Sequence, residues 1–362
     1  MIKKQPIRDG RARLREAYAR RGIALVLGAG VSYASGLPNW AGLMERVFAD
    51  LHDGSPPYPG LEDMSAPMLA SLLEERTPFT GDSTKEQRKA FAELVWNALY
   101  RDFEWTLGTK ITHGTAAQLV ERLDKNTTLK AVSAMCVARE GDTFTRNPKV
   151  RAVVTFNLDN LLQSHSVVKY CARYSSALRG ERSRNLILRT VERASASSRL
   201  SKTSVYHVHG LMRFDQPLEE LRKHAPDGLV LTEQDYFDVF NNATSMFNYS
   251  FLHLLREHTA VFVGLSMEDH NLRRLLHYSK RERVAALVAE GVTDIEEIRE
   301  TVGRHVALLK QKNPEADRAT EDTLRPLGVH VVWVRDYPEI PEVLAPVYET
   351  AGDWDAVYGT VA

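Results

Sequence analysis

Apolar residues gather in six short continuous runs instead of alternating with polar ones. The runs are rich in Val, Ile, Leu and Phe and lie at 23–27, 152–156, 205–208, 260–263, 306–309 and 329–334. Continuous hydrophobicity of this length is typical of strands buried on both faces of a sheet. Helix-like stretches separate several of the runs, for example those that begin at Asn271 and Thr320. The pattern predicts an α/β fold, a Rossmann-like doubly wound parallel sheet, and leaves the strand order open.

A proline- and glycine-rich break at residues 53–63, "DGSPPYPGLED", interrupts this alternation. The ninety or so residues after it have mainly helical patterning, which predicts an insertion after the first crossover. We therefore expect a Rossmann-like domain at 1–52 and 148–345, a helical insertion subdomain at 53–147 and a C-terminal tail at 346–362. Four aromatic residues near the middle of the insertion either fill its core or offer a contact surface: Trp96, Tyr100, Phe103 and Trp105.

Charge and cysteine content narrow the class of protein. Lys and Arg total 47, as do Asp and Glu, so no overall field favours nucleic acid or an anionic membrane. The two cysteines, Cys136 and Cys171, form no CxxC pair, which excludes a four-cysteine zinc module and fits a reducing compartment. With no signal-peptide pattern and no apolar run of eighteen residues, we expect a cytoplasmic protein without membrane association. The arginine-rich stretch 173–202 is interpreted as a solvated loop, with phosphate contact as the alternative.

The first candidate site segment is "LGAGVSYASGLP", directly after the first apolar run. Gly28, Ala29 and Gly30 permit a tight turn, and hydroxyls follow at Ser32 and Ser35, a pattern that favours phosphate binding at the start of a crossover. No lysine follows as in a Walker motif, so the segment does not indicate ATP. A merely structural turn remains the alternative.

Polar side chains also follow two later runs. The second run leads into Asn157, Asp159 and Asn160, and the third contains His207 and leads into His209 and Gly210. The carboxyl ends of strands form the ligand crevice of an open α/β sheet, so these residues are site candidates. Helix capping is the alternative for Asp159 and Asn160. A histidine at a strand end can act as a general base, and we assign this role to His209. His207 is interpreted as a structural residue. Strand alternation predicts that the two histidine side chains point to the same face of the sheet.

The fourth run is followed by the segment "GLSMEDHNLRRLL", which begins at Gly264. Gly264 and Ser266 suit a phosphate or a ribose at a second strand end, whereas Asp269 and Asn271 are typical helix-capping residues. Neither interpretation excludes the other.

The four segments together, in this order, resemble the sirtuin superfamily. "GAGVSYASGLP" is similar to its GAGxSxxSGIP cofactor loop, "TFNLDN" to TQNxD, "HVHG" to the segment of its catalytic histidine and "GLS" to GTS. The similarity is strongest to the sirtuin-like domains of bacterial anti-phage defence systems, which show TFNxD, HxHG and VFxGxSxxDxNLRxLL. It spans roughly residues 22–276.

This resemblance implies an NAD+ hydrolase that depletes NAD+ in abortive infection, with the fold of sirtuins. It implies Asn157 and His209 as the catalytic pair, Asn157 holding the nicotinamide ribose or the attacking water. It further implies eight cofactor-binding residues. The pyrophosphate is expected to contact Gly28, Ala29, Gly30 and Ser32, and the adenosine half Gly264 and Ser266. Pro38 is expected in the lid over the nicotinamide, and Asp159 is expected to support Asn157. NAD is then the substrate, and no metal is expected.

Two departures from the deacylase pattern bear on the substrate. The zinc module is missing, and Trp40 and Ala41 stand where deacylases have Phe and Arg in SGIPDFR. These departures argue against peptide deacylation and leave the cofactor contacts intact. An NAD-dependent deacylase, an ADP-ribosyltransferase and a non-catalytic nucleotide sensor remain alternatives to NAD+ hydrolysis, and the joint presence of Asn157 and His209 argues against the sensor. The resemblance also implies a homo-oligomer controlled by a separately encoded partner, such as a HerA-type ATPase.

Overall fold

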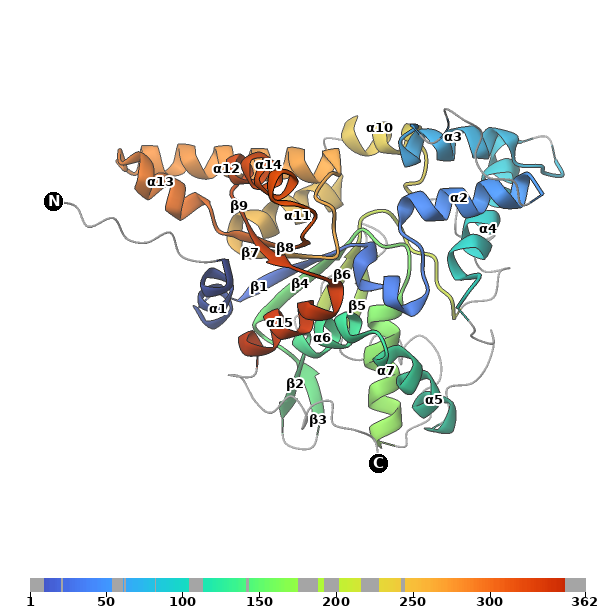
Figure 1. Cartoon of the computed structure of the whole chain (residues 1–362), viewed down its shortest axis with the longest axis horizontal. Helices are drawn as coiled ribbons and strands as arrows, with labels where there is room; N and C mark the ends of the chain where they lie inside the picture. The colour runs from blue at the N-terminus through green and yellow to red at the C-terminus, as the bar shows by residue number, and fades with distance from the viewer. Residues whose placement is uncertain are drawn as a thin grey trace.

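The computed structural model describes residues 10–20, 22–53, 61, 63–81, 83–103, 113–140, 143–174, 188–191, 202–215, 228–241 and 245–348. Its centre is a parallel sheet with the strand order β5-β6-β4-β1-β7-β8-β9 (Figure 1). The seven strands are β1 (Ile23–Leu27), β4 (Val150–Thr155), β5 (Leu188–Val191), β6 (Thr203–His207), β7 (Thr259–Val263), β8 (His305–Lys310) and β9 (Val329–Val334). This architecture confirms the predicted Rossmann-like α/β fold.

Six of these strands coincide with the six apolar runs, and β5 is the exception. It lies inside the stretch 173–202 that was interpreted as a solvated loop, so that interpretation is wrong for Leu188–Val191. The other residues of 175–201 lie outside the described part of the chain. β5 pairs in parallel with β6 at the edge of the sheet, and its two central side chains are only half-buried. A four-residue edge strand with polar central positions leaves no continuous apolar signal.

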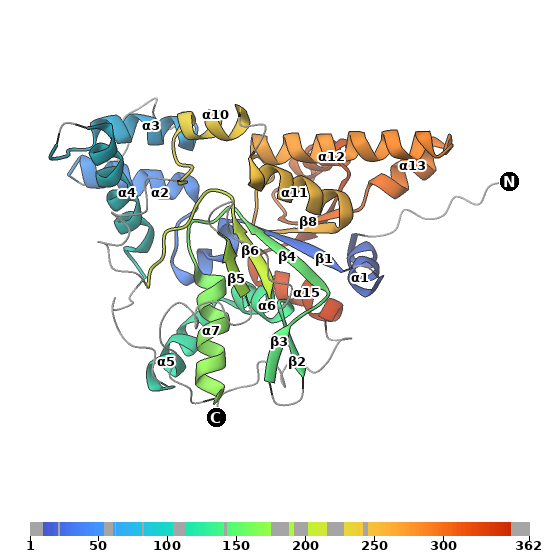
Figure 2. The same cartoon turned by 180° about the vertical axis from the view of Figure 1, so that it is seen from behind.

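Helices cover both faces of the sheet, and alternate residues of β1 show which face is which. Leu25 and Leu27 belong to one buried cluster, and Ala24 and Val26 to the other. The first cluster includes side chains from α1 (Gly10–Arg20), α5 (His113–Asp124), α6 (Thr127–Met135), α7 (Leu161–Tyr174) and α15 (Ile340–Tyr348). The second includes side chains from α11 (Met246–Glu257), α12 (His270–Ala289) and α14 (Pro314–Leu324). Figure 2 shows the three layers from behind.

Four further helices gather beyond the carboxyl ends of the central strands, as both views show (Figures 1 and 2). We call them the helical lobe: α2 (Trp40–Leu51), α3 (Ala66–Arg76), α4 (Thr84–Tyr100) and α10 (Glu233–Asn241). Buried side chains of α2, α3 and α4 belong to the same apolar cluster as the first face of the sheet. The range 53–147 also contains an antiparallel hairpin, β2 (Val137–Glu140) and β3 (Thr143–Arg146). Part of the predicted insertion thus shares one core with the sheet.

Three of the four aromatic residues near the middle of the insertion are described, and they pack in this core. Tyr100 and Phe103 are buried and pack edge-on against Phe214, while Trp96 is partly buried against the same cluster. Trp105 lies outside the described residues. Of the two alternatives for these aromatic residues, the structure supports packing in the core over a contact surface, because little of their surface is left for a partner chain.

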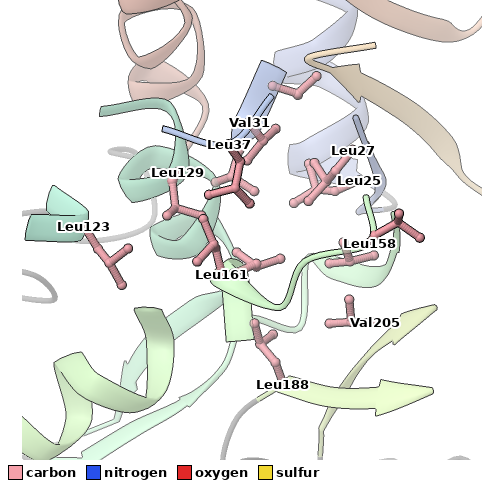
Figure 3. Close-up of a cluster of buried hydrophobic side chains, with 14 of the residues drawn as sticks. Leu25, Leu27, Val31, Leu37, Leu123, Leu129, Leu158, Leu161, Leu188 and Val205 are labelled. Carbon is pink, nitrogen blue, oxygen red and sulfur yellow. The ribbon is translucent and has the colours of Figure 1, made fainter. Parts of the chain in front are cut away.

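The first apolar cluster extends beneath the glycine-rich loop that follows β1. Figure 3 shows Val31 and Leu37 of this segment above Leu129 of α6 and Leu161 of α7. Apolar packing of this kind fixes where the loop lies relative to the sheet. Among the described residues, no helix is both long and apolar enough to cross a membrane.

Candidate functional site

The loops after β1, β4, β6 and β7 meet at the carboxyl edge of the sheet. β1 lies at its centre, with β4 on one side and β7 on the other, so the direction of strand addition reverses here. In open α/β sheets, ligands bind at such a reversal, outside the carboxyl ends of the strands. All four sequence-predicted segments therefore lie in one place, although the strands that precede them begin up to 236 residues apart in the chain.

The loops after β1 and β7 touch each other through glycines. The Gly28 amide donates to the Val263 carbonyl at 3.0 Å, and the Gly30 amide donates to the Gly264 carbonyl at 2.9 Å. A Cβ atom on Gly30 would lie 2.7 Å from the Gly264 Cα, and Gly264 itself has a φ of +70°. Glycine is thus required for the two loops to approach. Their proposed contacts with a pyrophosphate stay a prediction.

Ser32 joins the first loop to the second. Its Oγ donates to the Asp159 Oδ2 at 2.7 Å and accepts from the Asn157 Nδ2 at 3.2 Å. The Asp159 Oδ1 accepts from the Leu161 amide at the start of α7, so both the capping and the supporting interpretation of Asp159 hold. Burial raises the pKa of the Asp159 carboxyl, and the Ser32 hydrogen bond opposes this rise. Since the Ser32 hydroxyl proton is already donated, the side chain orients Asn157 in this conformation.

Asn126 is a supporting residue that sequence reasoning missed. It is fully buried, and its Nδ2 donates to the Val31 carbonyl at 2.8 Å and to the Ser35 Oγ at 2.9 Å. Its Oδ1 accepts from the Leu129 amide and thereby caps α6. Asn126 therefore attaches the loop after β1 to the helix layer. The capping pattern was present in the sequence, but its second role depends on a contact 95 residues away.

His207 is a structural residue, as predicted. Its Nδ1 lies 3.3 Å from the Asn157 carbonyl and its Nε2 lies 2.7 Å from the Gln163 Nε2. Both nitrogens are satisfied when Nδ1 donates and Nε2 accepts. Burial lowers the pKa of His207 to about 3, which keeps the ring neutral. His207 thus holds the backbone at Asn157.

His209 has different surroundings, and the prediction that both histidines share a face is wrong. β6 ends at His207, so alternation does not extend to His209 in the turn beyond. The His209 ring lies edge-on to Phe156, centroids 5.0 Å apart, and Phe156 packs against the second apolar cluster. Its ring also lies edge-on to Tyr236 of α10, at 5.3 Å. Its Nε2 lies 4.0 Å from the Asp269 Oδ2.

The helical lobe contacts two segments that follow this histidine in the chain. The Tyr100 hydroxyl donates to the Met212 carbonyl at 2.6 Å, and the Trp96 Nε1 donates to the Arg213 carbonyl at 2.9 Å. Arg88 donates to the Leu229 carbonyl and forms ion pairs with Asp235 and Glu74. Apart from the ion pair with Glu74, these links were not visible in the sequence, because each joins α4 to a segment more than a hundred residues later.

Glycine is also required beside His209. Gly210 has a φ of +84°, and a Cβ atom there would lie 2.5 Å from the Gly228 carbonyl oxygen. The Val230 amide donates to the His209 carbonyl at 3.0 Å. The space beside Gly210 is therefore filled by this returning segment and is not left for a substrate.

The remaining predicted site residues lie around these loops. Pro38 is half-buried, as is Trp40, whose Nε1 is buried with no hydrogen-bond partner among the described residues. Ser266 is exposed, and its Oγ accepts from the Glu268 amide. Asp269 caps α12 as expected, by accepting from the Leu272 amide. Asn160 bonds to Asp215 and to the Phe214 amide, which ties the second loop to the segment after Gly210.

Among the described residues, no group of three or more His, Cys, Asp or Glu side chains is arranged to hold a metal ion. Cys136 and Cys171 are both buried thiols, and burial raises the pKa of Cys136 to about 12. A thiol held protonated is a poor metal ligand. The four-cysteine zinc module of deacylases has no counterpart in a chain with two cysteines.

Comparison with known proteins gives one family match. Residues 151–323 match the model of a family described as SIR2-like domain, and no curated protein matches the chain. The match covers the segments of Asn157, His209 and Gly264, and it supports the sirtuin-like superfamily for this part of the chain. The glycine loop at 28–30 lies outside the matched range. SIR2-like domains use NAD, so the match indicates NAD-related enzymatic activity.

Proposed function

We propose that this protein is an NAD+ glycohydrolase that uses water to cleave the bond between nicotinamide and ribose. The products are ADP-ribose, nicotinamide and a proton. The observation that carries the proposal is the convergence of Asn157 and His209, from two different strands, beside the glycine loops after β1 and β7. A hydrogen-bonding amide, a histidine base and a glycine-lined strand reversal are what such a reaction requires.

Each residue has a role that follows from its position. Nicotinamide leaves as a neutral group from a positively charged ring, so the reaction needs little acid catalysis and depends on orientation and on an attacking water. His209 acts as the general base for that water or for a ribose hydroxyl. Asn157 orients the ribose or the water, and Ser32 and the His207 ring hold Asn157 from its side chain and its carbonyl. Burial lowers the pKa of His209, which keeps the base unprotonated at neutral pH.

The NAD+ molecule would extend along the strand reversal. In this proposal the pyrophosphate lies by Gly28, Ala29, Gly30 and Ser32, and the adenosine half lies by Gly264 and Ser266. Pro38 and Trp40 cover the nicotinamide. The buried Nε1 of Trp40, which has no partner among the described residues, fits a contact with a polar group of the substrate.

We further propose that NAD+ depletion serves anti-phage defence by abortive infection. The support is the motif resemblance to the zinc-less defence branch of the sirtuin superfamily. A toxic hydrolase needs external control, which favours a cytoplasmic homo-oligomer activated by a separately encoded partner such as an ATPase. Because the described aromatics of α4 are in the core, contacts through the helical lobe would use the exposed Met68, Phe79 and Phe237 instead.

Product analysis after incubation with NAD+ tests the proposal. The purified chain, alone and with a candidate partner, should release nicotinamide and ADP-ribose in equal amounts without any acceptor. His209→Ala and Asn157→Ala should each lower the rate by about a hundredfold to ten-thousandfold and leave the fold intact. His253→Ala, which removes an exposed histidine of α11, is the matched control and should keep the parent rate.

Three other outcomes would contradict it. Nicotinamide release that requires a protein or peptide acceptor would indicate a deacylase or a transferase. Binding of NAD+ without turnover, with and without partner, would indicate a sensor. Activity lost on chelation and restored by a metal would contradict the metal-free mechanism.

A further inference from the structure

One carboxylate lies near His209 that the proposed mechanism does not use. We propose that Asp269, supported by the Tyr236 hydroxyl, is the positioning residue that sets the tautomer and charge of His209. The catalytic part of this inference rests on the proposed function, whereas its electrostatic part concerns the protein without substrate. Sequence reasoning assigned Asp269 only to the cap of α12.

The two oxygens of Asp269 have separate tasks. Oδ1 accepts from the Leu272 amide at 2.7 Å, which fixes the carboxylate at the N-terminus of α12. Oδ2 lies 4.0 Å from the His209 Nε2. Both side chains are largely buried, with 14% and 15% exposed, so solvent screens this pair much less than a surface pair. A cap alone would require only one of the oxygens.

Tyr236 approaches the same carboxylate from α10. Burial and the negative charge of Asp269 raise the pKa of the Tyr236 hydroxyl, which therefore keeps its proton. Its ring lies edge-on to the His209 ring, as does Phe156. Tyr236 therefore restrains both members of the histidine–carboxylate pair.

α10 itself is anchored, so Tyr236 is not free to move away. Asp235 Oδ2 accepts from the Leu231 and Thr232 amides and from Arg88 of α4. The Glu233 amide donates to the Ser71 Oγ of α3. Helices α3 and α4 thus fix α10, the helix that carries Tyr236.

The charge balance around His209 follows from these contacts. Burial lowers the pKa of His209, and the Asp269 carboxylate opposes that shift. Among the described residues, the neutral Tyr236 and Phe156 also pack on the ring. A carboxylate facing Nε2 favours the tautomer with its proton on Nε2, so Nδ1 carries the lone pair that accepts a proton. When Nδ1 takes that proton, the adjacent carboxylate stabilises the imidazolium that forms.

The variant Asp269→Asn separates the effect of the negative charge from that of the helix cap, because asparagine caps helices as well as aspartate does. We expect kcat to fall by about tenfold to a hundredfold with little change in KM, since the binding groups are untouched. The acid limb of the pH profile of kcat/KM should move to lower pH by about one unit, because His209 loses the charge that raises its pKa.

The matched control is Asp294→Asn, which makes the same change at the N-cap of α13 (Ile295–Val302). Its rate and pH profile should equal those of the parent. A fall in kcat for Asp269→Asn with an unchanged acid limb would overturn the inference, because lost packing lowers the rate without moving the pKa of His209.

A titration of histidine-labelled protein by 15N NMR separates this inference from the proposed function. The His209 signal is assigned by its loss in His209→Gln. In the protein without NAD+, Asp269→Asn should lower the pKa of His209 by about one unit and shift the tautomer away from Nε2–H. An unchanged titration and tautomer would overturn the inference even if NAD+ is cleaved. If the parent protein fails to cleave NAD+, the proposed function is wrong, and the titration still tests whether Asp269 sets the tautomer and charge of His209.

Discussion

On the Asn157 side of the site, polar side chains are joined by hydrogen bonds of 2.7 to 3.3 Å, whereas on the His209 side the nearest carboxylate lies 4.0 Å from the ring. On the first side the Ser32 hydroxyl, one hydrogen of the Asn157 side-chain amide and the His207 imidazole donate within the protein. On the second, aromatic rings pack against a histidine whose ring nitrogens make no hydrogen bond within the described part of the chain. Fully paired groups hold geometry, and a base must keep a lone pair available for its substrate. The Asn157 side is therefore the scaffold, and the His209 side is where a proton can move.

Asp159→Ala should have the largest effect on this scaffold. It leaves the Ser32 hydroxyl and the Leu161 amide without their buried acceptor, which should lower the free energy of unfolding by about 3 kcal/mol. Urea denaturation measures this. Asp159→Asn keeps an acceptor for Leu161 and should cost less. A change below about 0.5 kcal/mol for the alanine variant would contradict the scaffold assignment.

Ser32→Ala should lower the free energy of unfolding by about 2 kcal/mol, because Asp159 loses a donor and Asn157 an acceptor. It should also lower NAD+ turnover through a misplaced Asn157. Ser35→Ala is the matched control in the same loop: it removes an acceptor of Asn126 but leaves the bond from Asn126 to Val31. Equal turnover losses in the two variants would show that Ser32 has no special link to Asn157.

His207 should make the scaffold sensitive to acid. Its folded-state pKa, lowered to about 3, lies below the usual value of about 6.5, so the unfolded chain binds its proton first as pH falls. The contribution of neutral His207 to the free energy of unfolding is fully present above about pH 6.5. It is lost as the pH falls toward 3, at up to about 1.4 kcal/mol per pH unit.

His207→Asn keeps a donor toward the Asn157 carbonyl and does not titrate. The stability difference between pH 7 and pH 5.5, measured by urea denaturation, should be about 1 kcal/mol smaller in this variant than in the parent. The same pH dependence in both proteins would show that other histidines carry it.

Arg88→Met should have the smallest effect on stability, about 1 kcal/mol, because its partners Asp235 and Glu74 remain partly solvated. On the His209 side it should lower kcat severalfold by loosening α10 and Tyr236. Lys89→Met breaks the neighbouring ion pair with Glu86 on the same helix and serves as the control. If both variants turn over NAD+ at the parent rate, the lobe does not help to position His209.

Much of the fold could be predicted because its signals are local. Six apolar runs became six strands, since a strand buried on both faces needs continuous hydrophobicity wherever it lies in the sheet. The strands of Asn157 and His209 were found for the same reason, and the rule that strand ends meet at one edge placed their side chains together. β5 had no such signal, because an edge strand with half-buried polar positions has the composition of a loop.

The sequence by itself determined the sheet, the segments at its carboxyl edge and the residue types offered there. Only the tertiary structure decided what each of those residues does, because that depends on neighbours distant in the chain. Ser32 meets Asp159 across 127 residues, and His209 meets Asp269 across the crossover from β6 to β7. Gly210 faces the Gly228 carbonyl, and α4 binds two segments that follow the histidine. Burial and hydrogen bonding, which decide between a structural histidine and a base, arise only when those segments pack.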